Sequence, residues 1–425
     1  MRIVCAPQEF DFASAGGELD VILYGRTQSL LLGSVGAAIK EEMARQKIQP
    51  DPRAWDFLSI ALSVMSTDLA GHRNKSPDGW TREFDLHIAV ADKVFWDSQK
   101  DTLEKLLMFL TTDRWSLSFL EGGFLPDPPD TLFRPEKDCA VLVSGGLDSF
   151  IGILDLVSQG KRPLAVSQSV RGDAEKQREL TALAGNVVRH LQLNHNANVP
   201  EPEEPPSQRA RSIIFFAYGI LAATSLAKYY AGEEVALYVC ENGFITINPP
   251  LTDARIGSLS TRTCNPVLVA LLQQVLDAAG LRVKVINPYS LKTKGEVLSD
   301  CGNQDVLRAN AHKTTSCGRF KRYGYKHCGR CIPCLIRRAA FRAWGVKDET
   351  VYFYTDLSVK DKNHAGFDDV RSVALASATV DDSGLDRWLG ATLVSPLIPD
   401  KEHIKQVITR GLAELVALLT HFRIQ

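Results

Sequence analysis

A glycine-rich stretch with hydroxyl and carboxylate side chains follows a short apolar run about a third of the way along the chain. Its sequence from Val141 to Ser149 is VLVSGGLDS. Gly145 and Gly146 can adopt backbone angles closed to other residues and leave room for a ligand against the main chain. A helix is expected to begin here, and its first backbone NH groups lie at the positive end of the helix dipole. The hydroxyls of Ser144 and Ser149 are further hydrogen-bond donors. Such a concavity suits phosphate or pyrophosphate.

A second group of reactive side chains comprises four of the nine cysteines, Cys317, Cys328, Cys331 and Cys334, spaced C-x10-C-x2-C-x2-C. Two overlapping C-x-x-C turns bring three sulfurs to one side of the backbone, and a loop supplies the fourth. This pattern predicts a tetrahedral zinc site. Because four thiolates leave no open coordination position, we expect the zinc to be structural and to clamp a loop near the active site. Free thiols, a redox pair or an iron–sulfur cluster are the alternatives.

Basic residues surround these cysteines. We interpret them as solvated surface, or as cations that offset the negative charge of the thiolates. Contact with phosphate or nucleic acid is the alternative, and it would depend on this patch alone, because the formal net charge of the chain is only −1. The patch comprises Arg319, Lys321, Arg322, Lys326, Arg330, Arg337 and Arg338.

The composition is that of a globular protein with several domains: 425 residues, 45% of them hydrophobic and 23% charged. The longest apolar stretch, Ser212 to Ala227, is interrupted by polar residues, so it predicts a buried helix and no membrane span. The first residues lack a basic region followed by a long apolar run. We therefore expect no secretory signal and a cytoplasmic location.

Four regions differ in their patterns. Residues 1–125 mix helical and strand-like runs and predict an α+β domain. Residues 126–137 belong to a proline-rich linker, since prolines at this density resist both helix and sheet. Residues 138–344 alternate between the two patterns and hold the glycine and cysteine motifs. Residues 345–425 contain two stretches with helical periodicity, which predict a helical extension that packs against the rest or meets a partner.

The alternation in residues 138–344 predicts an α/β fold, with a parallel sheet and helices on both of its faces. Ligands of such sheets bind at the carboxyl ends of the strands, where the glycine stretch lies. No internal repeat is apparent in the sequence. The expected elements are strand Ala140–Val143, a helix from Asp148, strand Leu164–Val170, helix Glu175–Leu191, helix Gln208–Ala231, strand Val235–Cys240, helix Pro266–Ala279 and strand Leu281–Ile286.

The string Ser-Gly-Gly-x-Asp-Ser resembles the signature of the PP-loop ATP pyrophosphatases, which cleave ATP between its α and β phosphates. No Gly-Lys-Ser or Gly-Lys-Thr follows, so it is not the Walker P-loop. The resemblance implies an adenine nucleotide α hydrolase-like fold in which Asp148 helps to hold Mg²⁺ on the phosphates. An ordinary strand-to-helix connection is the alternative. The implied ATP-binding residues are Ser144, Gly145, Gly146, Leu147, Asp148 and Ser149.

The glycine motif and the cysteine cluster together resemble the QueC family, the 7-cyano-7-deazaguanine synthases, over about residues 138–343. Three smaller matches support this. Arg211 opens the long apolar helix, NPYSLKTKGEV (Asn287 to Val297) resembles the family's Pro-x-x-x-x-Thr-Lys segment, and Thr314 and Ser316 precede the first cysteine of the cluster.

This resemblance implies an ATP-dependent carbon–nitrogen ligase. Transfer of AMP would activate the carboxylate of 7-carboxy-7-deazaguanine or a similar deazapurine, an amine would then attack, and AMP and pyrophosphate would be released. The protein contributes positioning and charge stabilisation. The residues implied to neutralise charge near the α phosphate are Lys294, Lys292 and Arg211, for which surface cations are the alternative.

Several features depart from a minimal member of that family. The N-terminal domain and the helical extension are additional, and the segment Glu241 to Thr263 differs from the family's usual substrate loop. The longer architecture resembles the QueC-like proteins of bacterial anti-phage defence, in particular the QatC proteins of the Qat system. We hypothesise that the amine belongs to a protein partner, so that the product is an amide-linked adduct.

Three other functions remain open at this point. One is a housekeeping synthase that uses ammonia. The second is a tRNA-modifying enzyme, which as a thiolase would need a catalytic cysteine pair outside the zinc set, such as Cys240 and Cys264. The third is an ATP-binding scaffold without catalysis.

Overall fold

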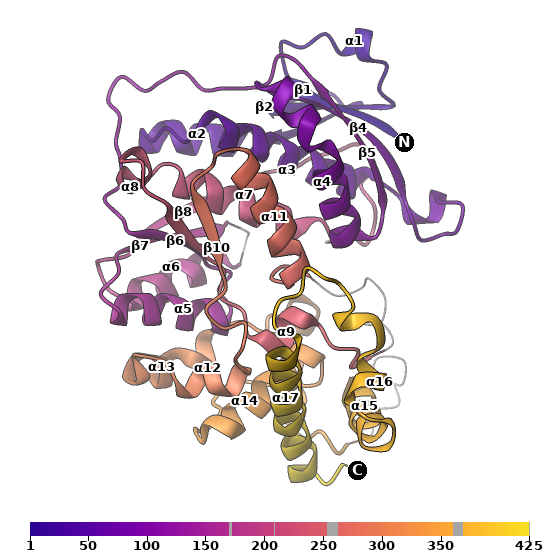
Figure 1. Cartoon of the computed structure of the whole chain (residues 1–425), viewed down its shortest axis with the longest axis vertical. Coiled ribbons are helices and arrows are strands. Elements are labelled where there is room, and N and C mark those ends of the chain that lie inside the picture. Colours follow the sequence, from indigo (N-terminus) through magenta and orange to yellow (C-terminus); the bar gives the residue numbers. More distant parts are fainter. Residues whose placement is uncertain (170–171, 208, 253–261, 360–368, 425) are drawn as a thin grey trace.

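A computed structural model describes residues 1–169, 172–207, 209–252, 262–359 and 369–424. Its N-terminal part is a parallel five-stranded sheet in the order β3-β2-β1-β4-β5, with helices packed against it (Figure 1). The strands are β1 (Arg2–Pro7), β2 (Leu19–Gly25), β3 (Leu32–Gly36), β4 (Glu83–Ala89) and β5 (Arg114–Leu120). The helices are α1 (Phe12–Ala15), α2 (Ala37–Gln46), α3 (Pro52–Ala70) and α4 (Lys93–Thr111).

The expectation of an α/β protein is confirmed, while the N-terminal sheet differs in detail from the α+β domain we expected. Helices α2 and α3 connect β3 to β4, and α4 connects β4 to β5. Crossover helices of this kind return the chain to the same end of the sheet, which makes successive strands parallel. The proline-rich segment that follows β5 forms neither helix nor strand.

The second sheet is also parallel and has the order β10-β9-β6-β7-β8. Its strands are β6 (Cys139–Leu142), β7 (Pro163–Gln168), β8 (Arg189–Leu193), β9 (Val235–Tyr238) and β10 (Val283–Ile286). Its helices are α5 (Leu147–Ser158), α6 (Ala174–Leu183), α7 (Arg211–Ala223), α8 (Ala227–Tyr230) and α11 (Pro266–Ala278).

The prediction of one helix over Glu175–Leu191 was wrong at its carboxyl end. Helix α6 ends at Leu183, Gly185 adopts a φ of +101°, and the chain then forms the edge strand β8. Glycine is favoured at such a φ, and it terminates the helix. Strand β8 lies at the edge of the sheet, and only two of its five residues, Leu191 and Leu193, are buried, so its sequence lacks the apolar run of a central strand.

The two sheets have the same strand order, an arrangement that the sequence does not show as a repeat. They share one hydrophobic core, because α3 and α4 of the first sheet pack against α7 and α11 of the second (Figure 1). The ends of α7 are therefore fixed partly by the N-terminal sheet.

One buried ionic network makes this connection. Arg82 is 2% exposed and binds the carboxylates of Asp68 and Asp113 at 2.5 and 2.6 Å. Asp68 also accepts a hydrogen bond of 3.3 Å from the backbone NH of Ala210, directly before α7. The buried charges are thus paired, and one of them caps the helix that begins at Arg211.

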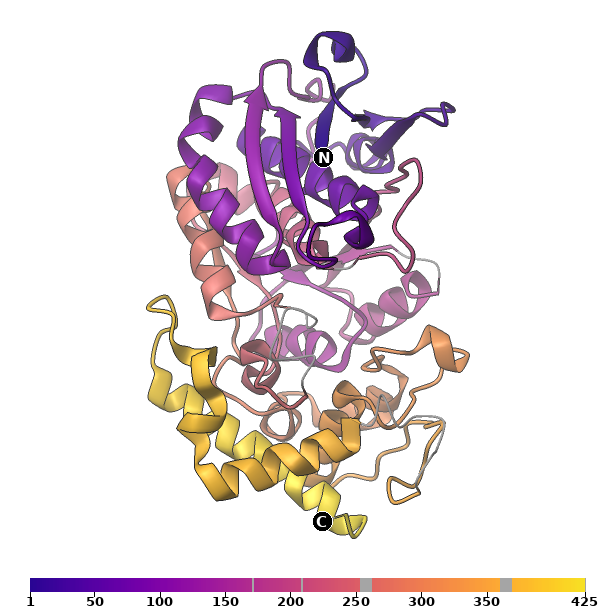
Figure 2. The same cartoon turned by 90° about the vertical axis from the view of Figure 1, so that its right-hand side faces the viewer.

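The remaining elements form a mainly helical part at the end of the molecule opposite the N-terminal sheet (Figure 2). The helical extension is confirmed. These helices are α9 (Gly243–Ile247), α12 (Lys294–Ser299), α13 (Gln304–Asn310), α14 (Ile332–Trp344), α15 (Asp369–Ser383), α16 (Leu385–Leu389) and α17 (Lys401–His421). Among the described residues, no helix is both long and apolar enough to cross a membrane.

Candidate functional site

The glycine loop, Ser144 to Ser149, connects the end of β6 to the first turn of α5. Gly145 has a φ of +79°, which turns the chain sharply. The Ser144 hydroxyl accepts a hydrogen bond from the backbone NH of Gly146 at 3.2 Å, and the Ser149 hydroxyl donates to the Gly146 carbonyl at 3.0 Å. Leu147 is buried beneath the loop, so it contributes its backbone and not its side chain. The loop is a rigid turn at the amino end of a twelve-residue helix, where an anion is favoured.

A buried ion pair lies beside this loop. The Lys294 ammonium donates to the Asp148 carboxylate, and the two residues are 6% and 7% exposed. The Asn242 side-chain amide donates to the same carboxylate at 2.8 Å. These three residues come from the ends of β6, β10 and β9, three adjacent strands. The sheet therefore brings Lys294 and Asp148 together.

A cavity of about 270 Å³ opens above the pair, and a second one adjoins it. The glycine loop, Asp148 and Lys294 line the first cavity. Arg211 and Lys176 line the second, together with Ser144 and Gly145. Burial lowers the pKa of both cations, and the charge of Asp173 only partly offsets this. An anion bound in this cavity would be stabilised by both.

Glu241 lines both cavities. Burial, and then the nearby charge of Asp148, raise the pKa of its carboxyl from 4.5 to about 7. A carboxyl with this pKa can accept a proton near neutral pH. Burial raises the pKa of the neighbouring Cys240 and Cys264 thiols, which disfavours the thiolate that sulfur-transfer chemistry would need.

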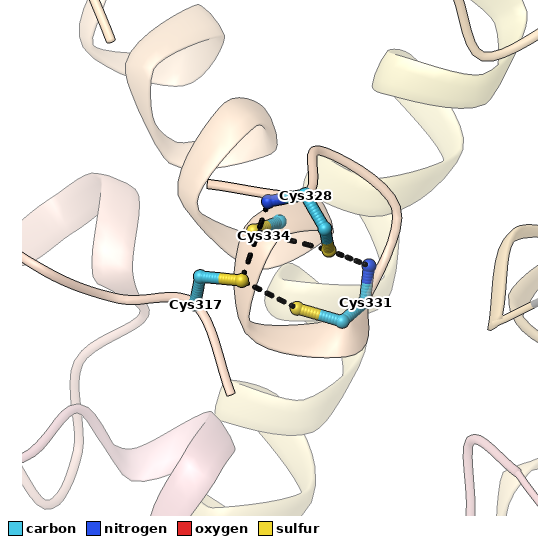
Figure 3. A group of neighbouring side chains, drawn as sticks. All are labelled: Cys317, Cys328, Cys331 and Cys334. Carbon is cyan, nitrogen blue, oxygen red and sulfur yellow. Dashed lines mark hydrogen bonds between the residues drawn. The ribbon is translucent and has the colours of Figure 1, made fainter. Parts of the chain in front are cut away.

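The four clustered cysteines are buried, and their sulfurs point toward one another (Figure 3). All four sulfurs lie within 4.8 Å of one another, with 3.8 Å between those of Cys331 and Cys317 and 3.9 Å between those of Cys328 and Cys334. Zinc–sulfur bonds of about 2.3 Å place tetrahedral sulfurs about 3.8 Å apart. Backbone NH groups of Cys328 and Cys331 donate to cluster sulfurs at 3.3 Å, which stabilises thiolates. The cluster fits a metal ion with four sulfur ligands.

The segment before the first of these cysteines contacts the glycine loop. The Thr315 backbone NH donates to the Gly145 carbonyl at 3.0 Å, and its hydroxyl accepts a hydrogen bond from Lys176 at 2.7 Å. Arg337, which is fully buried, donates to the hydroxyls of Thr314 and Ser316 at 2.9 and 3.0 Å. The segment before the cysteine loop is thus hydrogen-bonded to the glycine loop and stabilises its conformation.

The basic residues near the cysteines are only partly the solvated surface that we expected. Arg337 is buried, and Arg330 and Arg338 donate to backbone carbonyls of the segment after α14. They hold this segment against the cysteine loop. Lys321 and Lys326 are exposed. Lys292 lies away from both cavities, where it pairs with Asp300 at 2.9 Å on the surface.

Three residues of the site were not predicted from the sequence: Asn242, Glu241 and Lys176. The first two directly follow strand β9, and Lys176 lies in the first turn of α6 after β7. A search for polar residues just past each predicted strand would have found Asn242 and Glu241. Part of the altered segment, residues 253–261, lies outside the described residues.

The comparisons with known proteins agree on one family. The model of the queuosine biosynthesis protein QueC matches residues 262–345. The 7-cyano-7-deazaguanine synthase of Paracoccus denitrificans is 33% identical over 245 residues, which cover 51% of this chain and 94% of that protein. The enzyme of the same name from Acetivibrio thermocellus is 26% identical over 243 residues, 51% of this chain and 98% of that protein. With one third of its aligned residues identical to a synthase that it covers almost completely, the chain belongs to the QueC family.

Proposed function

We propose that this protein is an ATP-dependent carbon–nitrogen ligase of the PP-loop type. It adenylates the carboxylate of 7-carboxy-7-deazaguanine or a similar deazapurine and joins it to an amine, with release of AMP and pyrophosphate. The observation that carries this proposal is the buried Asp148–Lys294 pair beside the glycine loop. The names of the relatives, 7-cyano-7-deazaguanine synthases, support the substrate class.

Each residue of the proposed site has a separate role toward ATP. Backbone NH groups of the glycine loop and the hydroxyls of Ser144 and Ser149 hold the phosphates. Asp148 would hold the Mg²⁺ that accompanies the nucleotide, because carboxylate oxygens are its usual protein ligands. Lys294 neutralises charge that develops on the α phosphate. Arg211 and Lys176, which line the cavity on the Ser144 side, stabilise the pyrophosphate that leaves.

A deazapurine carboxylate is a poor electrophile, because its carbon is shielded by delocalised negative charge. Adenylation gives it a good leaving group, and the incoming amine then loses a proton as the amide forms. Glu241 lies between the two cavities and accepts this proton in its ionised form. The Asn242 amide keeps Asp148 oriented during both steps.

A pair of lysines tests the assignment of the ATP site. Lys294→Met removes the cation from the cavity, and pyrophosphate release with ATP and 7-carboxy-7-deazaguanine should fall by about 100-fold or more. Lys292→Met removes a surface cation two residues earlier and should leave the rate unchanged. Pyrophosphate and AMP are quantified in the same reactions. Equal rates for the two variants would contradict the assignment, and failure of the unaltered protein to form AMP would contradict the reaction class.

The role of Glu241 predicts a pH dependence. Its pKa of about 7 means that the ionised base forms as the pH rises, so amide formation should accelerate through pH 7. Glu241→Gln should remove this increase and slow amide formation about 100-fold or more, while adenylation of the carboxylate continues. Glu233→Gln, at an exposed residue, is the matched control. A pH profile that Glu241→Gln leaves unaltered would exclude the residue as the base.

We also propose that the four-cysteine cluster binds one structural zinc ion. Elemental analysis by mass spectrometry should find one zinc per chain, and Cys334→Ser should lower both the zinc content and the melting temperature. Cys301→Ser, at a buried cysteine outside the cluster, should retain the zinc. An iron–sulfur absorption spectrum, or full activity and an unchanged melting temperature of zinc-free protein assayed with Mg²⁺, would contradict this proposal.

We propose as the specific acceptor an amine on a protein partner, within an anti-phage defence system. Its support is the size of the chain, since these relatives align with only 51% of it, which leaves about half of the chain for partner contacts. Reactions with ATP, the carboxylate and the products of neighbouring genes, followed by intact-protein mass spectrometry, should show a mass gain on one partner. Nitrile in solution with ammonia, and no mass gain on any partner, would instead support a housekeeping synthase.

A further inference from the structure

Helix α17, in the extension beyond the family match, contacts two short helices that carry residues of the proposed site, α9 by packing and α12 through Glu414. It packs against α9 and α14, and Figure 1 shows it beside α9 below the second sheet. Helix α9 begins after Asn242, and α12 begins at Lys294. These are the two residues that bind the Asp148 carboxylate. The match to the family model ends at residue 345, so α17 is not part of the matched region.

Glu414 of α17 binds the residues on either side of Lys294. The Thr293 hydroxyl donates to its carboxylate, and so does the backbone NH of Gly295. A Cβ at Gly295 would lie 2.5 Å from the Glu414 carboxylate, so only glycine permits this approach. Thr293 is also the N-cap of α12, with Glu296 completing the capping box. The first turn of α12 is therefore held from inside by its own cap and from outside by Glu414.

The contact with α9 is a close fit of apolar groups. Gly411 of α17 lies on the ring of Phe244, and a Cβ at Gly411 would lie 2.3 Å from that ring. Phe244 is 1% exposed. Asn242, the N-cap of α9, accepts a hydrogen bond from the backbone NH of Ile245 at 3.2 Å while its amide holds Asp148. Movement of α17 would thus shift both partners of the Asp148 carboxylate.

We propose that α17 is a positioning element of the active site, and that Glu414 is the positioning residue that sets Lys294 against the α phosphate. This inference rests on the proposed function for the role of Lys294. Six-residue α12 is too short to be stable alone, so its orientation depends on what it contacts. A lysine displaced by about 1 Å loses much of its stabilisation of a transition state. Because Glu414 holds the turn that carries Lys294, we expect it to affect the rate of adenylation.

Variants of Glu414 test this in the full-length protein. Glu414→Leu removes both acceptors and should lower kcat for pyrophosphate release about tenfold or more, with a smaller change in KM for ATP. Glu414→Gln keeps one acceptor oxygen and should restore most of the rate. Glu402→Leu makes the same substitution on an exposed turn of α17 and should have no effect. Leu418→Ala, which loses buried apolar area but no hydrogen bond to α12, controls for stability.

Amide hydrogen exchange without substrates gives a readout that is independent of the reaction. Glu414→Leu should speed exchange in residues 293–299 and 242–247 and leave the second sheet protected. Inactivity of the unaltered protein would refute the proposed function, while localised exchange would still support positioning by α17. The positioning role is overturned if Glu414→Leu keeps the kcat of the unaltered protein. It is also overturned if Leu418→Ala, at the same loss of melting temperature as Glu414→Leu, loses as much activity and exchanges as fast in residues 293–299 and 242–247.

Discussion

The buried ion pair between Asp148 and Lys294 is the interaction on which the rest of the site depends. Removing two charges from water is unfavourable, and a buried pair persists only when hydrogen bonds and good geometry offset that loss. Here the Asn242 amide supplies the additional hydrogen bond. Because β10, β9 and β6 are adjacent, the three residues meet at the carboxyl ends of these strands although they are far apart in the sequence. The pair puts a cation and a potential metal ligand beside a loop suited to phosphate.

Three surrounding parts of the molecule fix this arrangement. The cysteine loop reaches the glycine loop through the Thr315 backbone, and buried Arg337 holds the residues on both sides of Thr315. Helix α3 of the N-terminal part contacts the start of α7 through the Asp68 carboxylate, which accepts a hydrogen bond from the backbone NH of Ala210. Helix α17 contacts α9 through Gly411 and α12 through Glu414. The N-terminal part and the helical extension therefore both contact elements of the proposed site.

Local patterns could be predicted from the sequence, and contacts between distant segments could not. The glycine loop and the four cysteines are short motifs whose spacing alone determines their geometry. The pairing of Lys294 with Asp148 depends on the strand order of the sheet, which was not predicted; only the family resemblance assigned both residues to one site. Strand β8 was missed because its short polar sequence follows a helical one. In the N-terminal sheet, the seven-residue apolar run of β2 was not recognised as a strand, and β3, with the sequence LGSVG, is only five residues long and holds two glycines.

Two basic residues have other roles in the structure than the sequence led us to expect. Lys292 belongs to the same motif as Lys294, but it points to the surface, because neighbouring residues of a turn face different directions. Arg337 lies among surface cations in the sequence, yet it is buried with its donors bound by hydroxyls and a carbonyl. Burial decides between such roles, and it depends on tertiary packing that a charge pattern does not reveal.

The most direct test of the account is a crystal structure of the protein with Mg²⁺ and a non-hydrolysable ATP analogue. The account predicts phosphates bound to the backbone NH groups between Ser144 and Ser149, with the Lys294 ammonium within hydrogen-bonding distance of the α phosphate and the metal on Asp148. A nucleotide bound elsewhere, or one bound at the loop while Lys294 remains paired with Asp148 and distant from every phosphate, would contradict it.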